Sequence, residues 1–335
     1  MVPDDHLERA LSALAKAAHE QDPWVREYVS GYVESQSGES IRRAYLRLLE
    51  LGGCSPEGVD ILDAGCGIGL GLAAYGLRGA RRLRGVDALP ELVRLARVYL
   101  SLLPKQIDLE LSHADASETG FPDRSFDVVI SVEAVSHMLE VDGFLAEAAR
   151  VLRPGGRLII SDGNNRRHRP TREYNLRLYE TTEFGKRPEI LVTEHQHLVR
   201  EPYVTKRARI VRHAAPQLTN DQVDFLALHT SGMVEAEITS VVRLYVESGI
   251  EPQSIYEPGT VPVEPYIAQV NERMFDPFEL RRQVERHGFS AKATGYWGGG
   301  SGNPALRAAN RVLAALSRVT IPTSRGFRII ATRGS

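Results

Sequence analysis

Four glycines fall within the nine residues DAGCGIGLG (63–71), directly after an apolar run and directly before a helical pattern. Glycine adopts backbone conformations that other residues avoid, and it lets a ligand approach the main chain closely. A glycine-rich turn between a buried strand and a helix is typical of the nucleotide-binding loop of an α/β sheet. The loop therefore favours a sheet that carries this turn at the carboxyl end of one strand.

Short apolar runs alternate with helical patterns from residue 59 onward, which is typical of parallel strands covered on both faces. We expect strands at 59–65, 82–88, 107–115, 126–134 and 156–163, with helices near 69–78, 89–103 and 141–152. A helix, glycine and strand pattern follows at 276–297, and the last apolar run is 325–333. The sequence thus predicts an α/β fold with a doubly wound, Rossmann-like sheet of seven strands.

The rest of the chain divides around this core. Residues 4–20 and about 40–51 have helical apolar spacing, and we expect an irregular stretch with Tyr28 and Tyr32 between them. After Gly163 the rhythm stops for more than a hundred residues that are polar, arginine-rich and mostly helical in pattern. A further helix is expected at about 304–318.

These patterns predict three regions. They are a helical N-terminal segment or lid (1–55), a core that binds the cofactor (56–162 and 276–335), and a large α-rich cap inserted after the fifth strand (163–275). The cap is expected to bind most of the substrate.

The overall charge is close to balanced, because 41 lysines and arginines stand against 43 aspartates and glutamates. We therefore expect neither nucleic acid nor a membrane as a partner. No apolar stretch is long enough to span a bilayer, and the N-terminus lacks the pattern of a signal peptide. These observations predict a cytoplasmic protein.

The spacing of the glycines separates two kinds of ligand. A dinucleotide loop needs G-x-G-x-x-G directly after the strand, whereas here only the variant G-x-G-x-x-A occurs, at 69–74, and it begins too far beyond the strand end. Asp63 would also face a pyrophosphate, which it repels. A cationic ligand that carries an ammonium and a sulfonium would be attracted instead.

At these residues the chain resembles the class I S-adenosylmethionine-dependent methyltransferases. Their first motif, acid-x-Gly-x-Gly-x-Gly, is matched by Asp63, Gly65, Gly67 and Gly69. The resemblance covers roughly 59–162 and resumes from about 276. It implies S-adenosylmethionine as the cofactor and S-adenosylhomocysteine as the product.

The resemblance also assigns further cofactor contacts. Asp87, at the end of LRGVDA, stands where the family places an acid that accepts hydrogen bonds from both ribose hydroxyls. Asp115 and Ala116 stand where the family's residues flank the adenine, and Ala88 and Ser131 complete the expected contacts. The segment RVLRPGGRLIISD is similar to the one that leads into the family's fifth strand.

His137 is the candidate catalytic residue, because related enzymes often place a residue facing the transferred methyl after the fourth strand. The family's reaction is an in-line displacement in which the protein supplies alignment and, for a nucleophile that carries a proton, a base. A neutral imidazole can serve as that base near pH 7. An orienting or packing role for His137 is the alternative.

The expected acceptor is a hydroxyl or carboxylate oxygen on a small or peptide-like bacterial metabolite, because a large cap suits selective enclosure of such a molecule. Methylation of nucleic-acid bases or amides is disfavoured, because the family's NPPY-type tetrad is replaced by Ser131-Val132-Glu133-Ala134. The cap's excess of positive charge between 163 and 213 either holds an anionic acceptor or is a solvated helix face. Arg172 is the cationic residue that we expect to contact the acceptor.

His195 and His197 lie two residues apart in TEHQHLV, which places both on one face of a strand. They lack an evident third metal ligand, and Cys54 and Cys66 are too few for a zinc cage or a disulfide framework. We therefore expect no metal and assign both histidines to the acceptor pocket or the surface.

Three alternatives stay open at this point. The acceptor atom could be nitrogen or carbon, or the fold could catalyse a cyclisation or rearrangement in which the cofactor loses no methyl. A non-catalytic protein whose cap recruits another protein is the third. The oligomeric state is also open, with a homodimer as one outcome.

Overall fold

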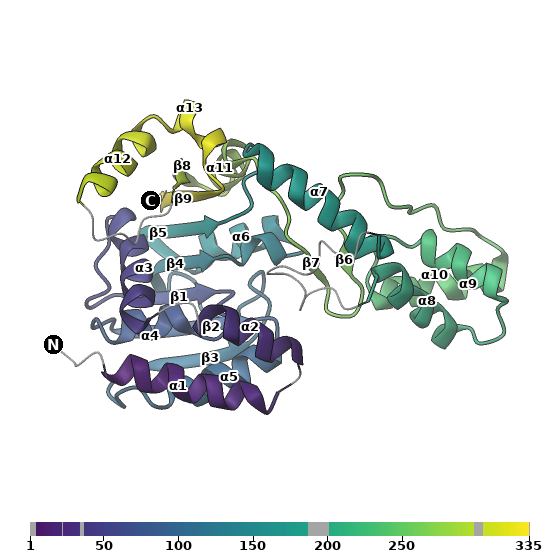
Figure 1. Ribbon diagram of the computed structural model, residues 1–335, viewed down its shortest axis with the longest axis horizontal. Coiled ribbons are helices and arrows are strands. Elements are labelled where there is room, and N and C mark those ends of the chain that lie inside the picture. Colours follow the sequence, from purple (N-terminus) through teal and green to yellow (C-terminus); the bar gives the residue numbers. More distant parts are fainter. Residues whose placement is uncertain (1–4, 22, 34–36, 187–200, 298–303, 335) are drawn as a thin grey trace. The chain divides into compact units, whose positions relative to one another are not determined.

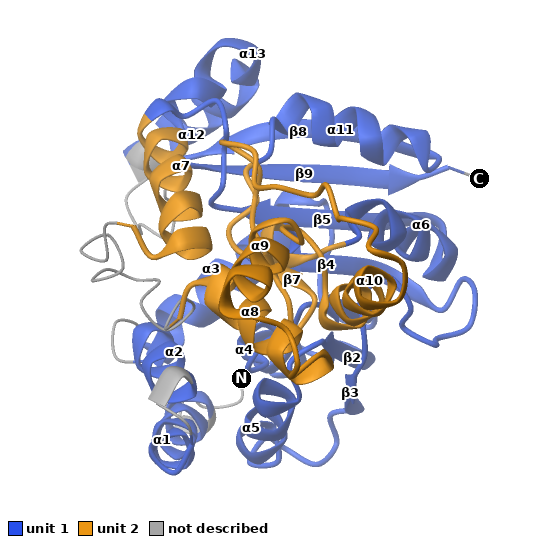
Figure 2. Ribbon diagram, turned by 90° about the vertical axis from the view of Figure 1, so that its right-hand side faces the viewer, with its two compact units in different colours: residues 1–135, 140–169, 275–335 blue, residues 136–139, 170–274 orange. Residues whose placement is uncertain are grey.

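The computed structural model describes residues 5–21, 23–33, 37–186, 201–297 and 304–334. The chain divides into two compact units (Figure 2). Unit 1 comprises residues 1–135, 140–169 and 275–335, and unit 2 comprises residues 136–139 and 170–274.

Unit 1 is built on a seven-stranded sheet of order β3-β2-β1-β4-β5-β9-β8 (Figure 1). Its strands are β1 (Asp60–Ala64), β2 (Arg82–Asp87), β3 (Leu109–His113), β4 (Phe126–Val132), β5 (Leu152–Asp162), β8 (Phe289–Tyr296) and β9 (Gly326–Arg333). The strands β1 to β5 pair in parallel, and β9 runs antiparallel to both β5 and β8. The predicted seven-stranded α/β sheet is confirmed.

Helices cover both faces of this sheet, with α1 to α5 on one face and α6 and α11 on the other (Figure 2). The helices of unit 1 are α1 (Asp5–His19), α2 (Pro23–Val33), α3 (Gly38–Leu51), α4 (Leu70–Gly76), α5 (Pro90–Leu100), α6 (Val141–Val151), α11 (Pro277–Arg286), α12 (Pro304–Ala315) and α13 (Ser317–Thr320). A short 3-10 turn, η3 (Ile321–Thr323), follows α13. The apolar residues whose spacing predicted the first helix form the buried face of α1. They are Leu7, Ala10, Leu11, Leu14 and Ala18, and all lie in the core.

The stretch that contains Tyr28 and Tyr32 is not irregular as predicted but forms the helix α2. Val25 and Val29 are buried one helical turn apart, and Pro23 stands at the first helical position. Proline is well tolerated there because its missing N–H has no partner within the helix. Packing of these two valines against the core stabilises a helix that has too few regularly spaced apolar residues to be predicted from its sequence.

Strand β5 begins earlier than predicted. Helix α6 ends at Val151, three residues before Pro154, and β5 starts at Leu152. The pairing with β4 is interrupted, because Phe126 pairs with Leu152 whereas Val128 pairs with Arg157. Pro154, Gly155 and Gly156 therefore lie within the strand, at this irregularity of the pairing.

Unit 2 contains the helical insertion that was predicted after the fifth strand. Its elements are the turn at η1 (Val135–His137), the helices α7 (Arg169–Phe184), α8 (Tyr203–Ala214), α9 (Asn220–Leu228) and α10 (Glu235–Ser248), and the hairpin strands β6 (Val263–Glu264) and β7 (Gln269–Val270). An apolar cluster that includes Val211, Leu226 and Val242 joins α8, α9 and α10. The buried Arg207 forms an ion pair with Glu183, which ties α8 to α7. None of the helices in the described ranges is both long and apolar enough to cross a bilayer.

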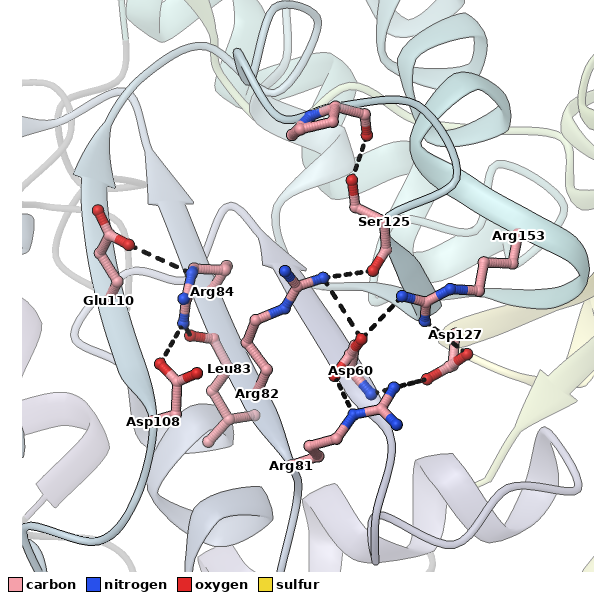
Figure 3. Close-up of polar contacts among 11 residues, drawn as sticks. Asp60, Arg81, Arg82, Leu83, Arg84, Asp108, Glu110, Ser125, Asp127 and Arg153 are labelled. Carbon is pink, nitrogen blue, oxygen red and sulfur yellow. Dashed lines mark hydrogen bonds and ion pairs between the residues drawn. The ribbon is translucent and has the colours of Figure 1, made fainter.

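An ion-pair network fixes the amino ends of several strands in unit 1 (Figure 3). Asp60, the first residue of β1, is buried and accepts hydrogen bonds from Arg81 Nε at 2.7 Å and Arg153 Nη2 at 2.9 Å. Arg153 Nη1 also donates to Asp127 Oδ1 at 2.7 Å, and Asp127 Oδ2 accepts from the backbone N–H of Asp60 at 2.9 Å. The network therefore joins β1, β4 and β5 at the edge opposite the glycine loop.

We expect Asp60→Asn to lower the free energy of unfolding by about 2–3 kcal/mol at pH 7, because it removes the buried negative charge that the surrounding guanidinium groups share and leaves them with Asp127 alone. Burial raises the pKa of Asp60, but the hydrogen bonds from Arg81 and Arg153 outweigh it and hold the pKa below its ordinary value. Such a group stabilises the fold above its unfolded pKa and loses that contribution as the pH falls through its folded pKa. Denaturant unfolding at pH 7 and pH 3 measures both effects.

The matched control is Asp123→Asn, because Asp123 pairs with Arg150 at the surface with 71% of its side chain exposed. We expect this variant to stay within about 0.5 kcal/mol of the wild type. An equal loss in both variants would contradict a special role for Asp60.

Candidate functional site

The glycine loop between β1 and α4 folds around the end of β2. The N–H groups of Gly65 and Cys66 both donate to the carbonyl oxygen of Val86, at 2.9 and 3.0 Å. Gly67 and Gly69 have φ angles of +51° and +77°, which residues with a side chain rarely adopt. Gly69 is also the N-cap of α4, so the loop leads directly into a helix N-terminus, as the sequence predicts.

Asp87, the last residue of β2, holds this loop in place. Its Oδ2 accepts a hydrogen bond from the N–H of Gly67 at 2.7 Å, and its Oδ1 accepts one from the N–H of Leu89 at 2.9 Å. A carboxylate oxygen can accept more than one hydrogen bond. Asp87 therefore both orders the glycine loop and places a buried anion beside it.

Asp63 lies close to Asp87 near the end of β1 and is only 4% exposed. Its Oδ2 lies against α4, 2.8 Å from the position that a Cβ on Gly71 would take. Within the part of the chain that the structure describes, no group donates a hydrogen bond to this carboxylate. Burial, followed by the charge of Asp87, raises the pKa of Asp63 to about 7.

This environment makes the ionised form of Asp63 costly. Because the folded pKa lies above the unfolded one, Asp63 favours the fold at low pH, and this contribution is lost as the pH rises from about 4 to about 7. We expect Asp63→Asn to remove this dependence and to raise the unfolding free energy at pH 8 by roughly 2–4 kcal/mol. Denaturant unfolding of the ligand-free protein at pH 5 and pH 8 measures it.

Asp108→Asn serves as the control, because 55% of the Asp108 side chain is exposed. It should have the same pH dependence as the wild type. The stability of the wild type should fall between pH 5 and pH 8 relative to that of Asp63→Asn. If it does not fall, the ionised form of Asp63 does not destabilise the fold, and the prediction is wrong.

Two tyrosines of the N-terminal helix α2 lie near this region of unit 1. The Oη of Tyr28, on α2, lies 2.9 Å from the position that a Cβ on Gly67 would take. The ring of Tyr32 lies 5.0 Å from that of Tyr28, measured between centroids. Burial raises the pKa of Tyr28 well above its ordinary value, and the nearby Tyr32 and Asp87 raise it further. Tyr28 thus reaches the glycine loop from a separate helix.

The other predicted cofactor residues follow strand ends at the same edge of the sheet. Ala88 is exposed directly after β2, and its carbonyl oxygen lies 3.1 Å from His113 Nε2. After β3, the exposed Asp115 accepts hydrogen bonds from the N–H and the hydroxyl of Ser117, and Ala116 is buried. Ser131, on β4, is fully buried, and among the described residues its Oγ has no hydrogen-bond partner.

His137 belongs to unit 2, at the end of the turn η1. Its Nδ1 lies 3.2 Å from the carbonyl oxygen of Val270. Since a carbonyl can only accept, this hydrogen bond requires the proton on Nδ1 and leaves the lone pair of the neutral ring on Nε2. That Nε2 lies 3.8 Å from Glu272 Oε1, so an imidazolium at this position would have a carboxylate beside it.

Helix α7 positions Glu272. The hydroxyl of the buried Tyr179 donates to the carbonyl oxygen of Glu272 at 2.6 Å, and the side-chain amide of Asn175 donates to the same oxygen at 3.4 Å. Glu272 has a φ angle of +58°, a strained conformation for a residue with a side chain. Sequence reasoning missed this residue, because it lies 135 positions after His137 and no motif marks it.

Of the three residues predicted to bind the acceptor, only one lies in the part of the chain that the structure describes. Arg172 is exposed on α7, whereas His195 and His197 lie outside the described residues. Many cations of the insertion are already paired, because Lys206 bonds Glu264, Arg207 bonds Glu183 and Arg209 bonds Glu201. In the described ranges no group of three or more histidine, cysteine or acidic side chains is placed to hold a metal ion.

The comparison with protein families gives one match, to the family described as a methyltransferase domain, over residues 62–160. These residues belong to the class I S-adenosylmethionine-dependent methyltransferases, whose methyl donor is S-adenosylmethionine. The matched region contains the glycine loop, Asp87, Asp115 and Ser131.

The curated relatives agree with this family. The 2-methyl-6-phytyl-1,4-hydroquinone methyltransferase of Synechocystis is 38% identical over 111 residues, which are 33% of this chain and 34% of that protein. The 27-O-demethylrifamycin SV methyltransferase of Amycolatopsis mediterranei is 34% identical over 144 residues, which are 42% and 52% of the two chains. The chain therefore spans about half the length of these relatives or less.

Among solved structures, an S-adenosylmethionine-dependent methyltransferase from Mesorhizobium loti aligns with 85% of this chain and 95% of its own. The sequence identity is 15% and the TM-score is 0.42.

Proposed function

We propose, from the methyltransferase domain of residues 62–160, that this chain transfers the methyl group of S-adenosylmethionine to an oxygen atom of a small or peptide-like metabolite. The observation that carries the donor is the pair of buried carboxylates at the glycine loop. Asp63 and Asp87 lie together in a site where burial, followed by the charge of Asp87, raises the pKa of Asp63. A cationic ligand relieves this repulsion, and an anionic dinucleotide increases it.

The residues fit S-adenosylmethionine chemically. Asp87 has acceptor oxygens for ribose hydroxyls, Asp63 is an anion for the ligand's positive groups, and the Gly67 backbone allows close approach. Asp115, Ala116 and Ala88 provide the edge at which the adenine would bind. When bound, this cofactor supplies a methyl group on a sulfonium that an acceptor oxygen can displace.

The observation that favours a hydroxyl acceptor is the pairing of His137 with Glu272. The Val270 carbonyl holds the ring in the tautomer whose Nε2 is free to take a proton, and Glu272 lies beside that nitrogen. His137 would remove the proton of the acceptor hydroxyl as the oxygen attacks, and Glu272 would stabilise the imidazolium that forms. The rifamycin relative, whose name specifies a 27-O-demethyl substrate, supports the choice of oxygen.

The experiment begins with titration calorimetry of the full chain with S-adenosylmethionine and with NAD. We expect micromolar affinity for the first and no heat from the second. The protein is then incubated with methyl-labelled cofactor and a panel of phenols, alcohols, carboxylic acids and amines. For the phenol and alcohol acceptors, labelled product that is stable to mild base indicates an ether, whereas label released as methanol from a carboxylic acid product identifies an ester.

The outcomes separate the alternatives. Label confined to amines or carbon would contradict oxygen methylation while leaving the methyltransferase activity in place. Consumption of an acceptor with cofactor bound and no S-adenosylhomocysteine formed would indicate the cyclisation or rearrangement chemistry instead. NAD binding would contradict the whole assignment of the glycine loop.

A further inference from the structure

The charge of the chain is distributed unevenly along its length. The last acidic residue is Glu285, and residues 286–335 contain eight lysines and arginines with no aspartate or glutamate. The rest of the chain therefore carries a net negative charge, although the total is only −2. Such a separation of charge is typical of a chain whose one end meets an anionic surface.

An apolar stripe lies within this basic region. Val312, Leu316 and Val319 are 59%, 53% and 72% exposed. They are spaced by four and three residues, and backbone hydrogen bonds from Leu316 N–H to Val312 and from Thr320 N–H to Leu316 continue the helical turn from α12 into α13. The three side chains therefore share one face. Arg311 and Arg318 are exposed next to this stripe.

The packed side of the same segment is well anchored. Ser317 and Ile321 are buried, and the hydroxyl of Thr320 donates to the carbonyl oxygen of Leu313 at 2.7 Å. Trp297, at the start of this connection, is half-buried, and its Nε1 donates to the hydroxyl of Thr323 at 2.9 Å. These contacts fix which side of the segment packs on unit 1 and leave the apolar stripe facing outward.

We propose that this face, formed by α12 and α13, is a docking surface for an anionic lipid bilayer. The aliphatic stripe would enter the headgroup region, while Arg311 and Arg318 would contact lipid phosphates. Tryptophan is typical of such an interface, and Trp297 lies at its start. The balanced total charge, from which we expected no membrane partner, conceals the basic character of this segment.

Charge complementarity decides among the possible occupants. A second copy docked through the same face would place arginines against arginines. A nucleic acid would satisfy the arginines but would leave the valines and the leucine in contact with phosphates and water. A bilayer with anionic headgroups satisfies both kinds of side chain. The binding is expected to be weak and reversible, because three aliphatic side chains bury little apolar surface.

The test is flotation of the full chain with vesicles of phosphatidylglycerol and phosphatidylcholine in equal parts, and with phosphatidylcholine alone. We expect binding to the anionic vesicles only, weakened several-fold when the salt concentration rises from 0.1 to about 0.5 M. The pair Leu316→Glu and Val319→Glu should reduce binding at least about tenfold, and so should Arg311→Gln with Arg318→Gln. In a Trp24→Phe background, the emission of Trp297 should shift to the blue when anionic vesicles are added.

The matched control is the pair Leu244→Glu and Ile250→Glu, whose apolar side chains are 45% and 54% exposed in unit 2. This pair should leave vesicle binding unchanged. The proposal would be overturned if the wild type did not bind anionic vesicles. It would also be overturned if the control pair lost as much binding as the Leu316 and Val319 pair. It would also be overturned by a dimer that the Leu316 and Val319 variants abolish without lipid, or by duplex DNA binding that survives these substitutions.

Discussion

Asp87→Ala is expected to lower the affinity for S-adenosylmethionine by at least about 100-fold. The proposed site gives Asp87 two charge-assisted hydrogen bonds with ribose hydroxyls, and each such bond contributes about 1.5–3 kcal/mol. The substitution also removes the acceptor for the Gly67 and Leu89 N–H groups. The glycine loop is therefore less ordered, in addition to the loss of the carboxylate that binds the ligand. Titration calorimetry with S-adenosylmethionine and S-adenosylhomocysteine measures the loss.

Two controls separate a local effect from unfolding. Asp115→Ala removes an exposed carboxylate that accepts hydrogen bonds from the backbone N–H and the hydroxyl of Ser117, so it should weaken binding less than Asp87→Ala does. Thermal unfolding of each ligand-free variant shows whether the fold is retained. A folded Asp87→Ala protein that still binds with micromolar affinity would show that the cofactor does not use the end of β2.

The sheet could be predicted from the sequence because each of its strands has a local signal. The run VDILDAG contains Ile61 and Leu62, both fully buried in β1, and the equivalent runs in β2, β4 and β5 follow the same rule. Helix α2 was missed because only Val25 and Val29 supply its buried face, and its neighbours are aromatic or polar. Its helical state depends on packing against α1, which no local pattern contains.

The residues of the candidate cofactor and catalytic sites also differ in how well they could be predicted from the sequence. Asp63, Gly67 and Asp87 could be found from sequence because each stands at a strand end with a fixed spacing along the chain. Tyr28 and Glu272 reach their partners from distant segments, and Glu272 does so with a backbone conformation that its residue type disfavours. Contacts of this kind are set by tertiary packing, so a single sequence gives no means of pairing Glu272 with His137.

The raised pKa of Asp63 connects the stability of the fold to the proposed ligand. A carboxylate that has no donor among the described residues lowers the stability of the empty protein near pH 8. Destabilising groups at a binding site are common, because the ligand compensates for them when it binds. Asp63→Asn should therefore stabilise the free protein while weakening the binding of a cationic cofactor, and both changes come from the same negative charge.

His137→Ala is expected to lower kcat by roughly 10²–10⁴-fold with a hydroxyl acceptor, because it removes the base that takes the proton. Glu272→Gln keeps the shape of its side chain but removes the negative charge near Nε2, so a smaller loss of roughly tenfold is expected. KM should change little in either variant, since the proposed interactions develop only as the proton moves. Steady-state kinetics of both variants with the acceptor found in the labelling experiment measure these losses.

A purely structural role for His137 predicts a different pattern. His287→Ala is the control, because His287 pairs with Asp142 in unit 1 and should leave kcat unchanged. Added imidazole should restore part of the activity of His137→Ala if the missing group is a base, whereas it cannot repair a packing defect. With a carboxylate acceptor no base is needed, so full activity of His137→Ala toward an acid would assign the protein to ester formation. Loss without rescue, together with normal activity of Glu272→Gln, would contradict the proposed pair, because a base and its charge partner must act on the same proton.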